Sequence, residues 1–166
     1  NKTLRSKVPK RDSKPSRLLL SIYNFLEVPF RRINPIPMKY KELIQSDKYR
    51  LGGGKLPRFQ YFMRLSSASN PIIRLYARIM YKLFAGRSLI EISPKTKIGY
   101  GLYIGHPHSI TINPKAIIGN NCNIHRSVLI GQQNRGRNQG TPVIGNNVWI
   151  GINAAIVGKV TIGDDV

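Results

Sequence analysis

At 166 residues the chain is long enough for one or two domains, and its 27 Lys and Arg against 7 Asp and Glu give a formal net charge of +20. The single cysteine excludes an intrachain disulfide framework, and no apolar run approaches the roughly 20 residues that a membrane span needs. The charge is uneven, because residues 1–90 carry 20 of the basic residues and only 4 of the acidic ones. This excess predicts attraction to something anionic, such as phosphates, an acidic lipid surface or nucleic acid.

The basic half, residues 1–90, is predicted to be mainly helical. Residues 1–17 contain two prolines and few apolar groups, which predicts a disordered arm. Apolar spacing predicts a short amphipathic helix over residues 17–28, and the three prolines of residues 29–37 should end it. A second helix is expected over residues 39–51, before a run of three glycines.

The clearest helical signal begins at Asn70, which can cap a helix whose first turn starts with Pro71 and which should end at Gly86. Apolar residues at helical spacing share one face: Ile72, Leu75, Tyr76, Ile79, Met80 and Leu83. Basic residues follow one another down the other face: Arg74, Arg78 and Lys82. We interpret these charges first as a solvated face, with a membrane surface or a subunit contact as the alternatives.

A six-residue repeat organises residues 91–166. Isoleucine recurs at this spacing, with a two-residue slip and one longer interruption, at positions 92, 98, 104, 112, 118, 124, 130, 144, 150, 156 and 162. A small or aliphatic residue follows most of these isoleucines four positions later. Neither an α-helix nor a half-buried strand has this period, whereas hexapeptide repeats are typical of a parallel β-helix. We therefore predict triangular coils of about 18 residues, with three short strands to a coil and the isoleucines inside.

Chemistry is expected where the repeat is broken, because a regular coil needs no irregularity. The first break, residues 105–109, inserts two residues and contains His106 and His108. The second break, residues 132–142, is a polar, glycine-rich loop of the kind that forms the wall of a binding cleft. These two segments are the candidate site.

The residues around the breaks resemble the serine acetyltransferases. Glu91-Ile92-Ser93-Pro94 and the stretch from Ile98 to His106 resemble the start of the left-handed β-helix in that family. The likeness continues through residues 112–114, 118–122, 128–131 and 143–151, and extends more weakly to residues 46–50. It is closest to the relatives that O-acetylate sugars in capsule and exopolysaccharide synthesis. The resemblance implies a left-handed parallel β-helix, a homotrimer, and O-acetyl transfer from acetyl-CoA without a metal.

The resemblance also implies roles for two residues. His106 takes the position of the general base, and Glu91, fifteen residues earlier, takes that of the acidic residue that orients the imidazole. The acceptor hydroxyl must lose its proton as it attacks the thioester carbonyl, and imidazole titrates near neutral pH. His108 is the rival within the same bulge, and a turn histidine without a chemical role is the alternative. His125 is interpreted as an outward structural residue or an interface contact.

Further positions follow from the resemblance. The substrate-binding candidates are His108, Arg135, Arg137 and Thr141. The acetyl-CoA contacts are expected at Gly131, Gly151, Ala154 and Lys159. The serine enzymes end the second loop in Arg-His, where this chain has Gly140-Thr141, and this favours a sugar hydroxyl over serine, the runner-up. The two loop arginines are interpreted either as ligands of the acceptor or of a phosphorylated carrier, or as solvated charges.

Other residues carry weaker expectations. Cys122 lies at a small inward position, which favours a buried structural thiol over a nucleophile. The three histidines, two of them in one bulge, do not match the zinc ligands of β-helical carbonic anhydrases, so no metal is expected. Because Val166 falls in the middle of a repeat, one or two further coils are expected beyond it.

The setting predicted for the enzyme is cytoplasmic, with a small-molecule or glycan acceptor. Residues 1–90 are expected to hold it at the anionic inner face of the cytoplasmic membrane, and nucleic acid is not an expected partner. A hypothesis of another class is a non-catalytic β-helix that binds membrane or nucleic acid through the same basic residues.

Overall fold

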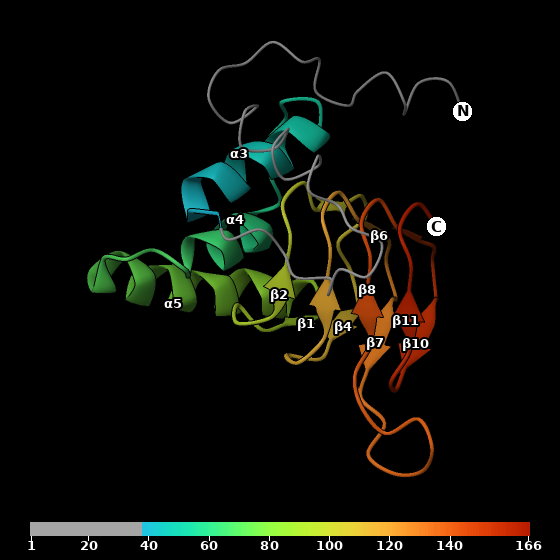
Figure 1. The fold of residues 1–166 in the computed structure, drawn as a ribbon. Coiled ribbons are helices and arrows are strands. Elements are labelled where there is room, and N and C mark those ends of the chain that lie inside the picture. Colours follow the sequence, from blue (N-terminus) through green and yellow to red (C-terminus); the bar gives the residue numbers. More distant parts are fainter. Residues whose placement is uncertain (1–37) are drawn as a thin grey trace. The chain divides into compact units, whose positions relative to one another are not determined.

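The computed structural model describes residues 38–166 (Figure 1), so the arm predicted at 1–17 and the helix predicted at 17–28 lie outside the described residues. The described part begins with three helices: α3 (Tyr40–Arg50), α4 (Arg58–Leu65) and α5 (Pro71–Arg87). The helices expected over residues 39–51 and from Pro71 onwards are therefore confirmed. Their observed bounds differ from the predicted ones by no more than one residue. Helix α4 was not predicted.

Helix α4 is weakly marked in the sequence because Pro57, the residue at its N-cap position, makes no side-chain capping hydrogen bond. Its burial comes from tertiary contacts, since Phe59 and Met63 enter the hydrophobic core. Its polar residues Gln60 and Arg64 are also buried. The helix is therefore stabilised by what it packs against and not by its own end signals.

Helix α5 begins as predicted, because the Asn70 side chain accepts hydrogen bonds from the backbone N–H of Ile72 (2.9 Å) and Ile73 (3.2 Å). Its buried face differs from the face with the regular apolar spacing. The buried residues are Ala77, Tyr81 and Ala85. The large apolar residues of the other face are exposed: Ile72, Leu75, Tyr76, Ile79 and Leu83. The two alanines carry only a methyl group, which leaves room for the helix to lie close to the body of the protein.

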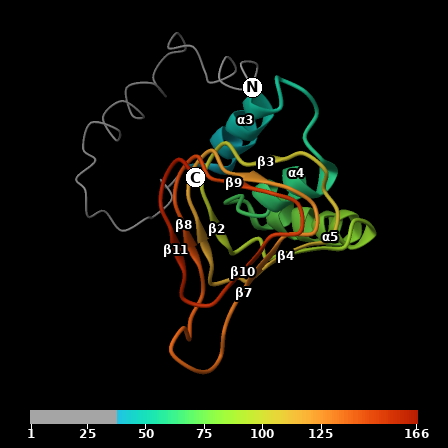
Figure 2. The ribbon, with the colours of Figure 1, turned by 90° about the vertical axis from the view of Figure 1, so that its right-hand side faces the viewer.

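Eleven short strands follow the helices. They are β1 (Ile90–Ile92), β2 (Lys97–Ile98), β3 (Tyr103–Ile104), β4 (Ile110–Ile112), β5 (Ile117–Ile118), β6 (Asn123–Ile124), β7 (Leu129–Gly131), β8 (Val143–Ile144), β9 (Trp149–Ile150), β10 (Ala155–Val157) and β11 (Thr161–Ile162). They form three parallel sheets, which we name sheet A (β1-β4-β7-β10), sheet B (β2-β5-β8-β11) and sheet C (β3-β6-β9). Successive coils stack on one another (Figure 2), and the predicted left-handed parallel β-helix is confirmed.

The isoleucines occupy the interior in the predicted phase. In sheet A, Ile92 pairs with Ile112, Ile112 with Ile130, and Ile130 with Ile156. The isoleucines of sheets B and C form two equivalent ladders, 98-118-144-162 and 104-124-150. Those of the first three coils are buried, whereas Ile156 and Ile162 in the fourth coil are partly buried. The six-residue period of the isoleucines therefore corresponds to one side of the triangular cross-section.

The helices are fixed to the first coil by a buried polar network. Arg64 Nε lies 2.9 Å from Asp47 Oδ2, and both side chains are almost fully buried. The guanidinium also donates to the carbonyl oxygens of Ile98 (2.9 Å) and Gly99 (2.6 Å). Asp47 Oδ1 in turn accepts from the N–H of Leu102 at 2.9 Å. The network satisfies backbone groups at the edge of the β-helix that no earlier coil covers.

Candidate active site

The histidine bulge, residues 105–109, lies at the corner where the chain passes from sheet C to sheet A. Glu91 of β1 pairs with Thr111 of β4, twenty residues further on, whereas Ile112 pairs with Ile130 after eighteen. The predicted two-residue insertion is therefore present in the first coil. The backbone of the bulge is anchored on both sides, since Ser109 N–H donates to Ser88 O (2.9 Å) and His108 O accepts from Ser127 N–H (3.0 Å).

The two histidine side chains of the bulge, His106 and His108, are both exposed. Within residues 38–166, neither imidazole has a hydrogen-bond or ion-pair partner. Both rings are therefore available to a ligand, which is the condition that a general base at this corner has to meet.

Glu91 lies in the middle of β1 with its side chain directed outward from sheet A. Its Oε2 accepts a long hydrogen bond from Thr111 Oγ1 at 3.5 Å. Glu91 borders a cavity of about 450 Å³ that Tyr81, Thr111, Asn113 and Gly131 also line. In this structure the carboxylate meets Thr111, and the predicted hydrogen bond to His106 is not formed among the described residues. Catalytic hydrogen bonds often tighten only when the substrate is bound, so the pairing stays a prediction.

The structure thus brings Glu91 and Gly131 to one cavity, together with residues that the sequence analysis had not selected. Thr111 and Asn113 are among these, and the hexapeptide register is the signal that would have found them. Thr111 stands directly beside Glu91 on the outer face of sheet A. Tyr81 reaches the cavity from α5, and its hydroxyl donates to Ile92 O. Burial raises the pKa of this phenol, which keeps it a neutral donor.

The loop at residues 132–142 lies at the other edge of sheet A, at the corner between β7 and β8, and it projects away from the coils (Figure 1). Its base is a two-stranded bridge in which Gln133 and Gly140 exchange two backbone hydrogen bonds of 3.0 Å. The next coil holds it as well, because Lys159 N–H donates to Asn138 O at 2.9 Å. The loop is therefore a hairpin whose base is held by backbone hydrogen bonds.

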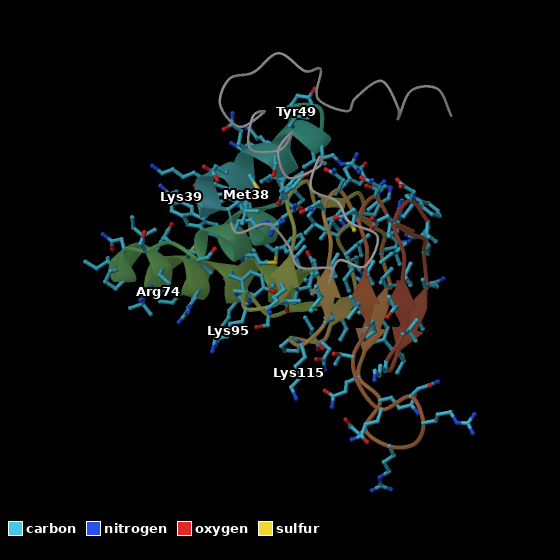
Figure 3. The ribbon with its side chains drawn as sticks, in the orientation of Figure 1. Met38, Lys39, Tyr49, Arg74, Lys95 and Lys115 are labelled. Atoms are coloured by element: carbon cyan, nitrogen blue, oxygen red, sulfur yellow. The ribbon has the colours of Figure 1, made fainter. Side chains whose placement is uncertain are left out.

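The substrate-binding candidates in this loop differ in their surroundings. The hydroxyl of Thr141 donates to the carbonyl oxygen of Lys115 at 3.3 Å, so it ties the loop to the preceding coil. Lys115 lies close to the start of the projecting segment (Figure 3). Arg135 and Arg137 are exposed and make no ion pair within the described part of the chain. The two arginines are available to a ligand, whereas the threonine hydroxyl already has a partner.

The four predicted acetyl-CoA contacts fall into two groups. Gly131 and Lys159 lie at the corner between sheets A and B, where Gly131 O accepts from Gly158 N–H at 3.2 Å. Gly151 and Ala154 lie in the turn from β9 to β10, on the same corner as the histidine bulge. Sheet A separates the two groups, so a single coil edge does not contain them all.

The corner of the histidine bulge continues into an aromatic pair formed by the half-buried His125 and the exposed Trp149. His125 lies edge-on to the ring of Trp149, with the ring centroids 5.0 Å apart. Several large apolar side chains of the β-helix are exposed: Leu129 40%, Trp149 57%, Ile152 49% and Val157 40%. None of them is among the site residues predicted from the sequence, although each stands at an outward position of the repeat or in a turn. Exposed apolar groups on a regular coil mark a surface for a partner.

Cys122 is fully buried, and its thiol lies 3.2 Å from Gly145 O. Burial raises the pKa of the thiol to about 11, so it is a protonated, inert group at neutral pH. The prediction of a buried thiol is confirmed. Residues 38–166 contain no group of three or more His, Cys, Asp or Glu side chains that could hold a metal ion. Over the same residues, no helix is long and apolar enough to cross a membrane.

Comparison with known proteins gives the fold a clear set of relatives. No family model matches the chain. A serine acetyltransferase of Helicobacter pylori is 34% identical over 90 residues, which is 54% of this chain and 53% of the relative. A serine acetyltransferase isoform of Entamoeba histolytica, solved in complex with cysteine, superposes with a TM-score of 0.59 and 26% identity over 76% of this chain and 50% of that chain.

A second structure, a serine acetyltransferase in complex with CoA, has a TM-score of 0.50 and 20% identity over 74% of this chain and 55% of that chain. The protein thus has the hexapeptide-repeat β-helix fold of serine acetyltransferases. The chain spans about half the length of the relatives it matches. The relatives named here are all serine acetyltransferases. These matches do not support the finer prediction that the chain is closest to polysaccharide O-acetyltransferases.

Proposed function

We propose that this chain is an O-acetyltransferase that moves the acetyl group of acetyl-CoA to a hydroxyl acceptor, with His106 as the general base. The observation that carries this proposal is the bulge, which lengthens only the first coil by two residues and presents an exposed, unpaired imidazole at the edge of sheet A. The name of the H. pylori relative and the CoA complex of the structural neighbour support the reaction and the donor.

His106 has two tasks in this proposal. Its neutral imidazole takes the proton of the acceptor hydroxyl while the hydroxyl oxygen bonds to the thioester carbonyl carbon. When the C–S bond then breaks, the imidazolium returns the proton to the leaving sulfur, and both ring and charge are restored. Glu91 is a positioning residue here, because its carboxylate would fix the tautomer of the ring and stabilise the imidazolium once the side chain turns from Thr111 toward it.

We further propose that the donor lies along the outside of the coils, against the backbone at Gly131, Gly151 and Ala154, with a CoA phosphate at Lys159. Glycine lets a ligand approach the main chain closely. These positions occupy both edges of sheet A, and a groove between two subunits would bring one edge of each subunit to the same donor molecule. The exposed apolar side chains of the β-helix, such as Trp149 and Ile152, support a homotrimer in which neighbouring subunits build this groove.

Serine is the first acceptor to test, because relatives of similar sequence are named serine acetyltransferases. A sugar hydroxyl of a surface polysaccharide precursor is the second candidate, and one observation favours it. The loop ends in Gly140-Thr141, and the threonine hydroxyl is already bound to Lys115 O. Neither residue offers the positive charge that a free amino acid carboxylate requires, and only Arg135 or Arg137 of this loop could supply it.

The test measures the release of CoA with serine and with a panel of sugars as acceptors, for the native chain and for His106→Asn and His108→Asn. We expect His106→Asn to lower turnover by about 10²-fold or more and His108→Asn to lower it much less. Light scattering on each variant checks that the assembly is intact. Near-full turnover by the His106 variant would show that another group is the base. Saturation by serine at low millimolar concentration would select serine over the sugar.

A further inference from the structure

The outer face of α5 is an exposed apolar surface. Its members are Ile72 78%, Leu75 63%, Tyr76 54%, Ile79 59% and Leu83 49% exposed. They follow one another at intervals of three or four residues, so they form one continuous stripe along a helix about 25 Å long. The residues that face the core, Ala77, Tyr81 and Ala85, lie on the opposite side. We name these five exposed residues the α5 stripe. An apolar stripe of this size on a surface marks an interaction site.

The charges on α5 all have one sign. The helix contains no Asp or Glu, and Arg78, Lys82 and Arg87 are exposed beside the α5 stripe. A helix that is exposed, apolar along one line and purely cationic at its margins has the side-chain pattern of helices that lie in the interface of an anionic bilayer.

A basic groove adjoins the α5 stripe. A cavity of about 560 Å³ is lined by Met80 and Phe84 of α5, each one residue after a member of the stripe. The other lining residues include three exposed cations, and none of the lining residues is acidic: Lys48, Gly53, Gly54, Lys55, Leu56, Arg58, Tyr61 and Phe62. Tyr76 of the stripe touches the ring of Phe62 edge-on, with centroids 5.9 Å apart, so the two surfaces are continuous.

The aromatic floor of this groove is preorganised. Phe62 and Phe84 are stacked with centroids 5.6 Å apart, and the Arg58 guanidinium lies 5.2 Å from the centroid of Phe84. An anion bound by the cations would therefore sit beside apolar rings, as the phosphate of a lipid does beside its acyl chains. The groove and the stripe thus favour the same kind of ligand.

Charge distinguishes an anionic bilayer from a two-fold-related second copy as the occupant of the α5 stripe. In a two-fold contact with a second copy, Arg78 and Lys82 would meet the same cations of the partner, on a chain whose formal net charge is +20. In an anionic bilayer, lipid phosphates would contact these cations, and the acyl chains below the headgroups would contact the α5 stripe. We propose that the outer face of α5 and the adjoining basic groove bind the surface of an anionic lipid bilayer. This proposal does not rest on the acetyl-transfer reaction.

The experiment is sedimentation of the full chain with vesicles of phosphatidylcholine alone and of phosphatidylcholine with phosphatidylglycerol, at low and high salt. Binding to the mixed vesicles is expected, and salt should weaken it because salt screens the attraction to the surface. Arg78→Gln/Lys82→Gln should weaken partitioning by about 30-fold at low salt, since each basic residue near an anionic surface contributes about a fivefold increase. Leu75→Ser/Ile79→Ser should weaken it at both salt concentrations.

The matched control is Lys95→Gln/Lys97→Gln, which removes the same charge from two exposed positions on the β-helix and should leave partitioning nearly unchanged. An equal loss with this control would mean that net charge alone drives binding, and it would overturn the proposal. So would an absence of binding to the mixed vesicles. A fall in the assembly mass of Leu75→Ser/Ile79→Ser, with unchanged vesicle binding, would identify the stripe as a subunit contact instead. His106→Asn should bind like the native chain, which separates this test from the proposed reaction.

Discussion

Among the glycines of the described residues, Gly119 is the one whose added Cβ would come nearest to backbone atoms of another coil, so Gly119→Ala tests the stacking directly. A Cβ at Gly119 would lie 2.6 Å from the carbonyl carbon of Gly145 in the next coil, and closer still to its oxygen. The φ of Gly119 is not in the left-handed region, so space alone decides the outcome. Ordinary van der Waals contact begins near 3.4 Å, and the coil below would therefore have to move by about 1 Å.

The obstructing atoms at Gly145 belong to backbone that is fixed on both sides. Gly145 N–H donates to Ile162 O at 2.9 Å, and the preceding residue, Ile144, pairs in register with Ile118 and Ile162. A side chain could rotate away, but a laddered carbonyl cannot. Overpacking of this kind costs about 2–3 kcal/mol, which corresponds to a fall in Tm of about 5–10 °C for a chain of this size.

Thermal unfolding followed by circular dichroism measures the effect of Gly119→Ala, with Gly86→Ala as the matched control. Gly86 lies in α5, and a Cβ there has nothing within 4 Å. The same substitution should stabilise the protein by about 0.5–1 kcal/mol, because alanine favours a helix over glycine. A Tm for Gly119→Ala within a degree of the native value would mean that the coils are not packed at this distance, and the structural reasoning would fail.

Two more predictions concern the buried groups. Asp47→Ala leaves the buried Arg64 guanidinium without its carboxylate and should lower the free energy of unfolding by about 3–5 kcal/mol in urea, whereas the exposed Glu42→Ala should cost under about 1 kcal/mol. The Cys122 thiol should not react with iodoacetamide at pH 8 until the chain unfolds. Its folded pKa of about 11 exceeds the ordinary value of 9.0, so its contribution to stability should be present below pH 9 and lost as the pH rises toward 11.

Each of these two predictions has a result that would contradict it. Equal losses for Asp47→Ala and Glu42→Ala would mean that the network with Arg64 is not a buried unit. Rapid alkylation of Cys122 in the native protein would mean that the corner of the coil opens to solvent. The comparison of native chain and Cys122→Ala at pH 8 and at pH 10.5 isolates the titration, since only the native chain should lose stability through this thiol.

The fold of residues 91–166 could be predicted from the sequence because each side of a coil takes six residues. Inward-facing positions therefore recur every six residues along the chain. Only a side chain of nearly constant volume fits every layer of the triangular interior, and isoleucine recurs in phase for that reason. The slip before Ile112 and the interruption before Ile144 were predicted as insertions into the coils, and the structure contains both. Both appear as coils of greater length that leave the ladders of sheets A and B in register.

The helical half could be predicted only in part, because its packing depends on contacts that periodicity does not contain. A hydrophobic pattern identifies an apolar face of α5, but the face that packs is the one with Ala77 and Ala85, where the backbone can come close. Helix α4 is held by Gln60 and Arg64, two polar residues whose burial depends on Asp47 and on backbone carbonyl groups of the first coil. No local signal distinguishes such residues from solvated ones.

The candidate site could likewise be predicted in part: its segments follow from the sequence, whereas their placement on the coil follows only from the structure. The sequence selects the two breaks in the repeat, and the structure shows that they lie on opposite edges of sheet A, with His106 at one edge and the loop of Arg135 at the other. Glu91 stands on the sheet between them, beside the cavity that reaches Gly131. One chain therefore holds the proposed base and the proposed wall of the cleft on different edges of sheet A. We therefore propose a three-fold ring in which the bulge of one subunit lies beside the loop edge of the next, because such an assembly would bring the two parts of the site to one acceptor.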